Sequence, residues 1–167
     1  MHQDVQHALD ALCAATAGLD AGGLAWHPPG RWSAAQILDH LRKAYGGTTH
    51  VLGRCLESGQ TKARPVTLRD RLYTLVVVRL GHLPGGRTAP EVTRPSETPD
   101  PNIVTLAEAA LLAFGEAADR AEARFGPTTR LMNHPILGPL TAPQWRRFHL
   151  VHTRHHMKQI ARRRSGV

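Results

Sequence analysis

Apolar residues recur every three or four positions through most of this chain, and stretches rich in glycine and proline separate the runs. This spacing places the apolar side chains on one face of an α-helix, so each run predicts an amphipathic helix that packs against a core. No stretch reads convincingly as a half-buried strand. The pattern therefore predicts an all-α chain with helices over residues 5–19, 33–59, 67–80, 105–125 and 141–163.

Capping residues support several of these helix starts. Ser33, Thr67 and Thr141 stand shortly before three of the apolar runs, where a hydroxyl oxygen can accept an unpaired backbone N–H. Gln144 follows Thr141 at the spacing of a capping box. Residues 84–101 are rich in Pro, Gly and Thr and lack periodicity, which predicts a long connecting loop at the surface.

Length and composition favour one helical domain. The 167 residues contain no internal repeat, which indicates a single domain over residues 1–167 with a basic tail from about residue 162. Hydrophobic residues make up 41% of the chain and aromatic residues only 5%, so the core must consist mainly of Leu, Ala, Val and Ile. Such a composition favours packed helices over a β-sandwich.

The charge balance is basic, with 21 Lys and Arg against 13 Asp and Glu and a formal net charge of +8. This excess permits contact with nucleic acid or a membrane surface, but aromatic residues are not interleaved with the basic ones as single-strand binders require. We therefore expect no specific nucleic-acid partner. No apolar run approaches the roughly 18 residues of a membrane span, so we expect no membrane partner either.

The cysteines and the first residues bear on the location of the protein. Cys13 and Cys55 are the two cysteines, and their separation indicates neither a disulfide framework nor a thiolate metal site. His2, Gln3 and Asp4 open the chain in place of a charged and then apolar leader. Both observations favour a reducing, cytoplasmic location.

Eleven histidines are the most unusual count in the composition. In the last predicted helix, His152 and His156 lie one turn apart on the face that also carries Trp145 and Phe148. Two histidines at this spacing can converge on one metal ion. Thr153 follows the first of them, so the pair lacks the glutamate of the zinc metalloprotease motif. Such a pair also arises by chance in a histidine-rich chain, and a site with an open position needs a third ligand.

Two stretches of the chain resemble the DinB-like superfamily, which is named for DNA-damage-inducible proteins. The two stretches read Trp26-x5-Trp32-Ser-x-x-Gln-Ile-Leu-x-His40-Leu41 and His134-Pro-x-x-Gly138-x-Leu-x3-Gln144-Trp145-x2-Phe148-x3-His152-x3-His156-x2-Gln159. The resemblance implies a four-helix bundle of DinB-like type with long connecting loops and a metal-binding histidine triad. One ligand comes from the second helix and two come from the last, which carries over to His40, His152 and His156.

The resemblance also implies cofactors and an activity. The ion is a divalent metal, with zinc or nickel first and iron or manganese as alternatives, and a low-molecular-weight thiol is a possible second cofactor. Characterised relatives are thiol-dependent S-transferases and a mycothiol-dependent isomerase, and many form dimers. We therefore expect a homodimeric, metal-dependent transferase or hydrolase that acts on a small-molecule substrate. The alternative is a non-catalytic metal-binding stress protein with a structural ion.

Several polar residues near the expected triad have two interpretations each. Without a metal, His40 is a histidine at the core edge that bonds a backbone carbonyl. His134 is a candidate catalytic acid–base residue or an auxiliary partner of the metal, or else a turn residue that caps nearby carbonyls. Gln159 either orients a ligand or makes a buried polar contact. We expect Asp39, which neighbours His40 on a different helix face, to be a solvated carboxylate.

Overall fold

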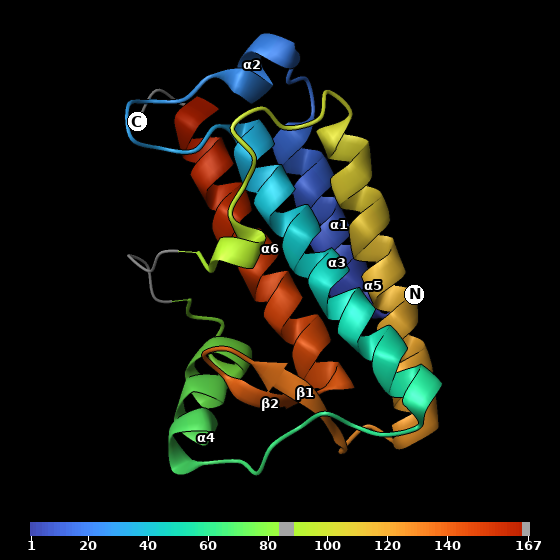
Figure 1. Ribbon diagram of the computed structural model, residues 1–167. Coiled ribbons are helices and arrows are strands. Elements are labelled where there is room, and N and C mark those ends of the chain that lie inside the picture. The colour runs from blue at the N-terminus through green and yellow to red at the C-terminus, as the bar shows by residue number, and fades with distance from the viewer. Residues whose placement is uncertain (84–88, 165–167) are drawn as a thin grey trace.

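The computed structural model describes residues 1–83 and 89–164 of the chain. This part is mostly helical, and four long helices lie side by side in an arrangement like a helical bundle (Figure 1). The most extensive packing is between α3 and α5 and between α1 and α6. The expectation of a predominantly helical chain is therefore confirmed. The helices are α1 (Gln3–Thr16), α2 (Ala21–Ala25), α3 (Ala34–Ser58), α4 (Leu68–Thr74), α5 (Ile103–Phe125) and α6 (Ala142–Arg164).

Small and aliphatic side chains build the core, as the composition predicts. Leu41 and Leu52 of α3 and Leu111 and Ala118 of α5 have no exposed surface, and the aromatic Tyr45 and Phe114 are fully buried with them. Each fully buried leucine contributes roughly 1.5–3 kcal/mol relative to an exposed one. This burial, more than helix propensity, stabilises the long helices. No helix among the described residues is both long and apolar enough to cross a membrane.

The predicted caps are present in the structure. Ser33 Oγ accepts the backbone N–H of Gln36 at 3.1 Å, and the side chain of Gln36 accepts the N–H of Ser33 at 2.9 Å. Thr67 forms the same reciprocal pair with Asp70 at the start of α4. Thr141 forms it with the glutamine three residues later. These local bonds fix where α3, α4 and α6 begin.

A short β-hairpin, which the sequence pattern does not predict, joins α5 to α6. Strand β1 (Arg130–His134) pairs antiparallel with β2 (Gly138–Thr141). Every residue of β2 is buried, so the strand shows none of the apolar–polar alternation that identifies a half-buried strand. The expectation of a chain without strands is therefore wrong for residues 130–141.

Some boundaries also differ from the predicted ones. The first helix ends at Thr16, and the glycines at 22 and 23 lie inside α2. The third predicted helix is α-helical only to Thr74 and continues as the π-helix η1 (Leu75–Arg79). The predicted loop over 84–101 contains the 3-10 helix η2 (Glu91–Thr93), while residues 84–88 lie outside the described part. The basic residues 162–164 continue α6.

Asp70 connects α4 to the hairpin. Its side chain is buried and accepts two hydrogen bonds from the Arg64 guanidinium, at 2.6 and 2.8 Å, and one from the N–H of Thr67. The Arg64 guanidinium, and then the Thr67 N–H, hold the pKa of Asp70 well below its ordinary value. Gly138, with a φ of 71°, lies directly against this carboxylate, because a Cβ at residue 138 would stand 2.3 Å from Asp70 Cγ.

We expect Asp70→Asn to lower the thermal midpoint, and we expect the difference from the wild type to be pH-dependent. The folded-state pKa of Asp70 is below the unfolded value, so its stabilisation is fully present above about pH 4 and declines as the pH falls further. Thermal denaturation of both proteins followed by circular dichroism, at about pH 7, 5 and 3, measures this. An equal difference at every pH contradicts the assigned role of the carboxylate.

We expect Gly138→Ala to destabilise the protein by about 2–4 kcal/mol, because the new methyl group meets Asp70 and the backbone has a positive φ. Gly47→Ala is the matched control: Gly47 is exposed on α3 and a Cβ there meets nothing within 4 Å. That control should be neutral or stabilise by up to about 1 kcal/mol. Urea denaturation compares the two, and equal effects refute the close contact at residue 138.

Candidate metal centre

Helices α3 and α6 bring three histidines together. His40 lies in the second turn of α3, and His152 and His156 lie one turn apart in the middle of α6. Their side chains are buried, with 5%, 8% and 8% of each residue exposed. One ring nitrogen from each lies within 4.8 Å of the others. The structure therefore brings the three predicted metal ligands close together, although 112 residues separate His40 from His152.

Two of the distances within this triad are close to the separation of nitrogens that share one ion. Nε2 of His152 is central, and it lies 3.1 Å from Nε2 of His40 and 3.1 Å from Nε2 of His156. A tetrahedral zinc ion with bonds of ~2.0–2.1 Å holds neighbouring nitrogens ~3.3 Å apart. No fourth His, Cys, Asp or Glu side chain joins these three histidines in the described part of the chain.

Hydrogen bonds at Nδ1 of His40 and Nδ1 of His156 determine whether the Nε2 atom of each ring carries a lone pair or a hydrogen. Nδ1–H of His40 donates to the backbone carbonyl of Thr93 at 2.7 Å, and Nδ1–H of His156 donates to Oε1 of Gln159 at 2.9 Å. A neutral imidazole has one N–H, so Nε2 of His40 and Nε2 of His156 each carry a lone pair. Nε2 of His152 carries at most one hydrogen, so it can donate to only one of these two lone pairs. A divalent cation satisfies all three nitrogens at once.

His152 is held differently from its two neighbours. Its Nδ1 is buried and has no hydrogen-bond partner among the described residues. Its ring instead stacks on the ring of Phe148, with 5.4 Å between the centroids. Packing thus orients the central ligand, whereas hydrogen bonds orient the outer two.

Burial keeps these imidazoles uncharged. Burial lowers the pKa of His40, and burial together with the charge of His40 lowers the pKa of His156 to about 3. The pKa of His152 lies well below its ordinary value because of burial and of the neighbouring His156 and His40. The three rings are therefore neutral at about pH 7, which is the protonation state that binds metal.

Asp39 fastens the segment that carries the Thr93 carbonyl. Its carboxylate accepts the backbone N–H of Ser96 at 2.8 Å and pairs with Lys43 at 2.9 Å, while Lys43 also donates to the Arg94 carbonyl. Burial acts to raise the pKa of Asp39, but these bonds outweigh it and lower the pKa to about 2. The expectation that Asp39 is solvated is wrong, because residues 93–96 cover it.

Comparison with known proteins gives a family for the chain. Residues 2–163 match the family described as "Protein of unknown function (DUF1569)". The chain belongs to the DUF1569 family. No curated protein and no solved structure matches the chain.

Membership in DUF1569 corrects the assignment to the DinB-like superfamily. The DinB-like resemblance rested on two motifs that cover about a third of the chain, whereas the DUF1569 match covers nearly all of it. The thiol cofactor and the homodimer were implied by that resemblance alone. The histidine triad of this DUF1569 protein rests instead on its own geometry.

His134, the predicted catalytic residue, lies in the hairpin and outside the triad. Its Nδ1 accepts the backbone N–H groups of Ile136 and Leu137, both at 3.1 Å, so it caps a turn through N–H groups and not through carbonyls. Burial lowers its pKa to about 4. Its ring contacts Phe148, at 4.4 Å between centroids, and Phe148 also stacks on His152. The turn-capping role is observed, and a catalytic role stays a prediction.

We expect Gln159→Leu to weaken metal binding by about 10–100-fold while the metal stoichiometry is kept, because Gln159 orients His156 without touching its Nε2. Lys158→Leu, at the exposed neighbouring position on α6, is the matched control and should bind as the wild type does. Competition for zinc with a chelating dye measures both affinities. Equal affinities for the two variants would contradict a role for Gln159 in orienting His156 toward the metal.

Proposed function

We propose that this protein binds one divalent metal ion through His40, His152 and His156 and leaves a coordination position open for a small molecule. The proposal rests on the Nε2 lone pairs of His40 and His156, which both point at the buried imidazole of His152. Without a cation, at least one of these lone pairs is buried without a hydrogen, which is costly. With one, each of the three Nε2 atoms has a partner.

The chemistry of the site favours a metal-dependent enzyme. Three neutral imidazoles leave the charge of a divalent ion uncompensated, so the ion lowers the pKa of a water or thiol in its open position and stabilises developing negative charge. A metal-dependent hydrolase or transferase therefore fits the site. Three imidazole nitrogens suit zinc or nickel, with iron as an alternative, whereas manganese prefers oxygen ligands.

A structural ion is the second candidate, and one observation favours it. The ion would join α3, through His40, to α6, through His152 and His156, and these two helices pack mainly on other partners, α5 and α1. An ion between them would brace the four long helices, which we propose form a four-helix bundle. In that case the protein is a metal-binding stress protein without turnover.

Elemental analysis of the purified protein tests metal binding. We expect one ion per chain in the wild type and in His50→Ala, whose histidine is exposed on α3 away from the triad. We expect His40→Ala and His152→Ala to lose the ion while circular dichroism shows retained helix content. Stoichiometric metal in both triad variants refutes the proposed site.

Chelation then separates the two candidate functions. The enzyme proposal expects a metal-free protein that remains folded and a turnover of ester or thiol substrates that returns when metal is added. The structural proposal expects the metal-free protein to lose its cooperative thermal transition, and no turnover in either state. Thermal denaturation and an ester hydrolysis assay on the same samples provide both measurements.

A further inference from the structure

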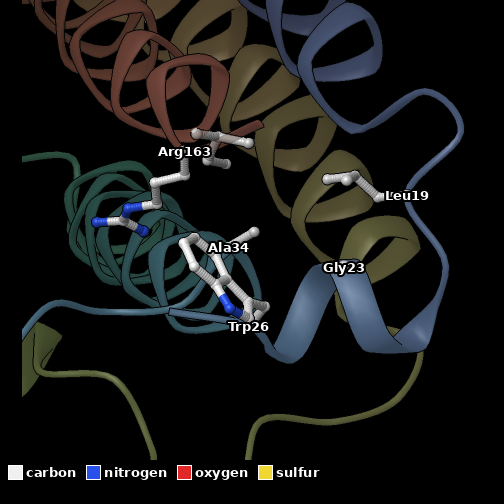
Figure 2. Close-up of a pocket in the computed structure, with 6 residues that line it drawn as sticks. Leu19, Gly23, Trp26, Ala34 and Arg163 are labelled. Carbon is white, nitrogen blue, oxygen red and sulfur yellow. The ribbon is translucent and has the colours of Figure 1, made fainter. Parts of the chain in front are cut away.

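A cavity of about 300 Å³ lies where α2, the start of α3 and the end of α6 meet. In Figure 2 the side chains of Trp26 and Arg163 lie on one side of it and that of Leu19 lies on the other. This volume is at the lower end of those that hold small ligands. The residues that line the cavity are Leu19, Gly23, Trp26, Ala34, Ile160 and Arg163.

Arg163 is the charged residue of this cavity, and it has no partner among the described residues. Its Nη1 atom is buried without a hydrogen bond, and no described carboxylate forms an ion pair with it. Burial, and then the nearby positive charge of Arg31, act together to lower the pKa of Arg163. Arg163 is partly buried, and a guanidinium nitrogen cut off from water without a partner is unfavourable, so an anion in contact with it would relieve the cost.

The rest of the lining is suited to an apolar body. Ile160 is almost fully buried and Leu19 is partly buried at the core edge. Trp26 as a residue is 55% exposed although it borders the cavity. A large aromatic face beside an unpaired cation offers contact to a molecule that has one apolar end and one charged end.

We propose that this cavity binds a small organic anion, with a carboxylate or phosphate group on Arg163 and an apolar body against Trp26 and Leu19. Arg163 follows His156 by seven residues, which is about two turns of α6, so it lies on the same helix face about 10 Å further along. A ligand anchored here would have to extend along this face to reach the triad, whose histidines do not line the cavity. Its role as a substrate rests on the proposed metal function, whereas the anion site itself does not.

Calorimetric titration tests the site with three compounds of similar shape, which are benzoate, phenyl phosphate and the neutral benzyl alcohol. The protein is the full chain in buffer with a chelator, so that an anion cannot bind to a metal. Arg163→Met removes the charge and keeps the length of the side chain, and Arg163→Lys keeps the charge. Arg162→Met is the matched control, because Arg162 is the exposed neighbour with the same charge.

We expect at least one of the two anions to bind the wild type and Arg162→Met equally. Arg163→Met should weaken that binding by about tenfold or more, with partial recovery in Arg163→Lys. Benzyl alcohol should bind more weakly than the anion and be insensitive to the loss of Arg163. The better of the two anions identifies the charged group as a carboxylate or a phosphate.

Two results would overturn the inference. One is that neither anion binds the wild type at millimolar concentration, and the other is that Arg162→Met and Arg163→Met weaken binding equally, which indicates only diffuse attraction to a basic surface. The same titration with His152→Ala keeps the two proposals separate. Anion binding in this variant supports the anion site whatever the fate of the metal site, and a wild type that takes up metal in elemental analysis but binds no anion in this titration supports the metal site alone.

Discussion

The direction of two hydrogen bonds controls what the centre of this protein can bind. The Thr93 carbonyl and the Gln159 side chain each hold the Nδ1–H of a buried histidine, and this fixes the lone pair at Nε2. If either bond were absent, its ring could rotate or change tautomer, and Nε2 could carry the hydrogen. Three buried imidazoles would then be a neutral hydrogen-bonded cluster and not a ligand set. The chemistry proposed for the site follows from these two acceptors.

The orientation of α6 is the next requirement. Arg146 is almost fully buried, and it pairs with Asp119 at 2.6 Å and with Glu122, both on α5. One turn later, Nε2–H of His149 donates to Thr48 Oγ1 of α3 at 3.0 Å. Because these contacts reach two different helices, they oppose rotation of α6 about its axis. The direction in which the two histidines of the triad point is thereby fixed, and so is the helix face that leads on to the anion-binding cavity.

The sequence predicts the helical framework and part of the site. The predictable features depend on local spacing along the chain, and the others depend on contacts between segments far apart in sequence. His152 and His156 are predictable as a pair because four residues make about one turn. The apolar neighbours of His40 indicate that it points inward, but not that it meets α6. Thr93 contributes a backbone carbonyl, which any residue possesses, so no side-chain pattern marks it. Asp39 lies off the apolar face and is buried only because a distant segment folds over it.

X-ray absorption spectroscopy at the zinc edge, applied to the zinc-loaded wild type and to the His40→Ala variant, tests directly whether the buried triad binds the metal. We predict three imidazole nitrogens at about 2.0–2.1 Å and one further light donor atom in the wild type. In the variant, the contribution of one imidazole should disappear or zinc should be lost. A wild-type spectrum with fewer than two imidazoles, or identical spectra for the two proteins, would contradict the assignment of the buried triad as the metal site.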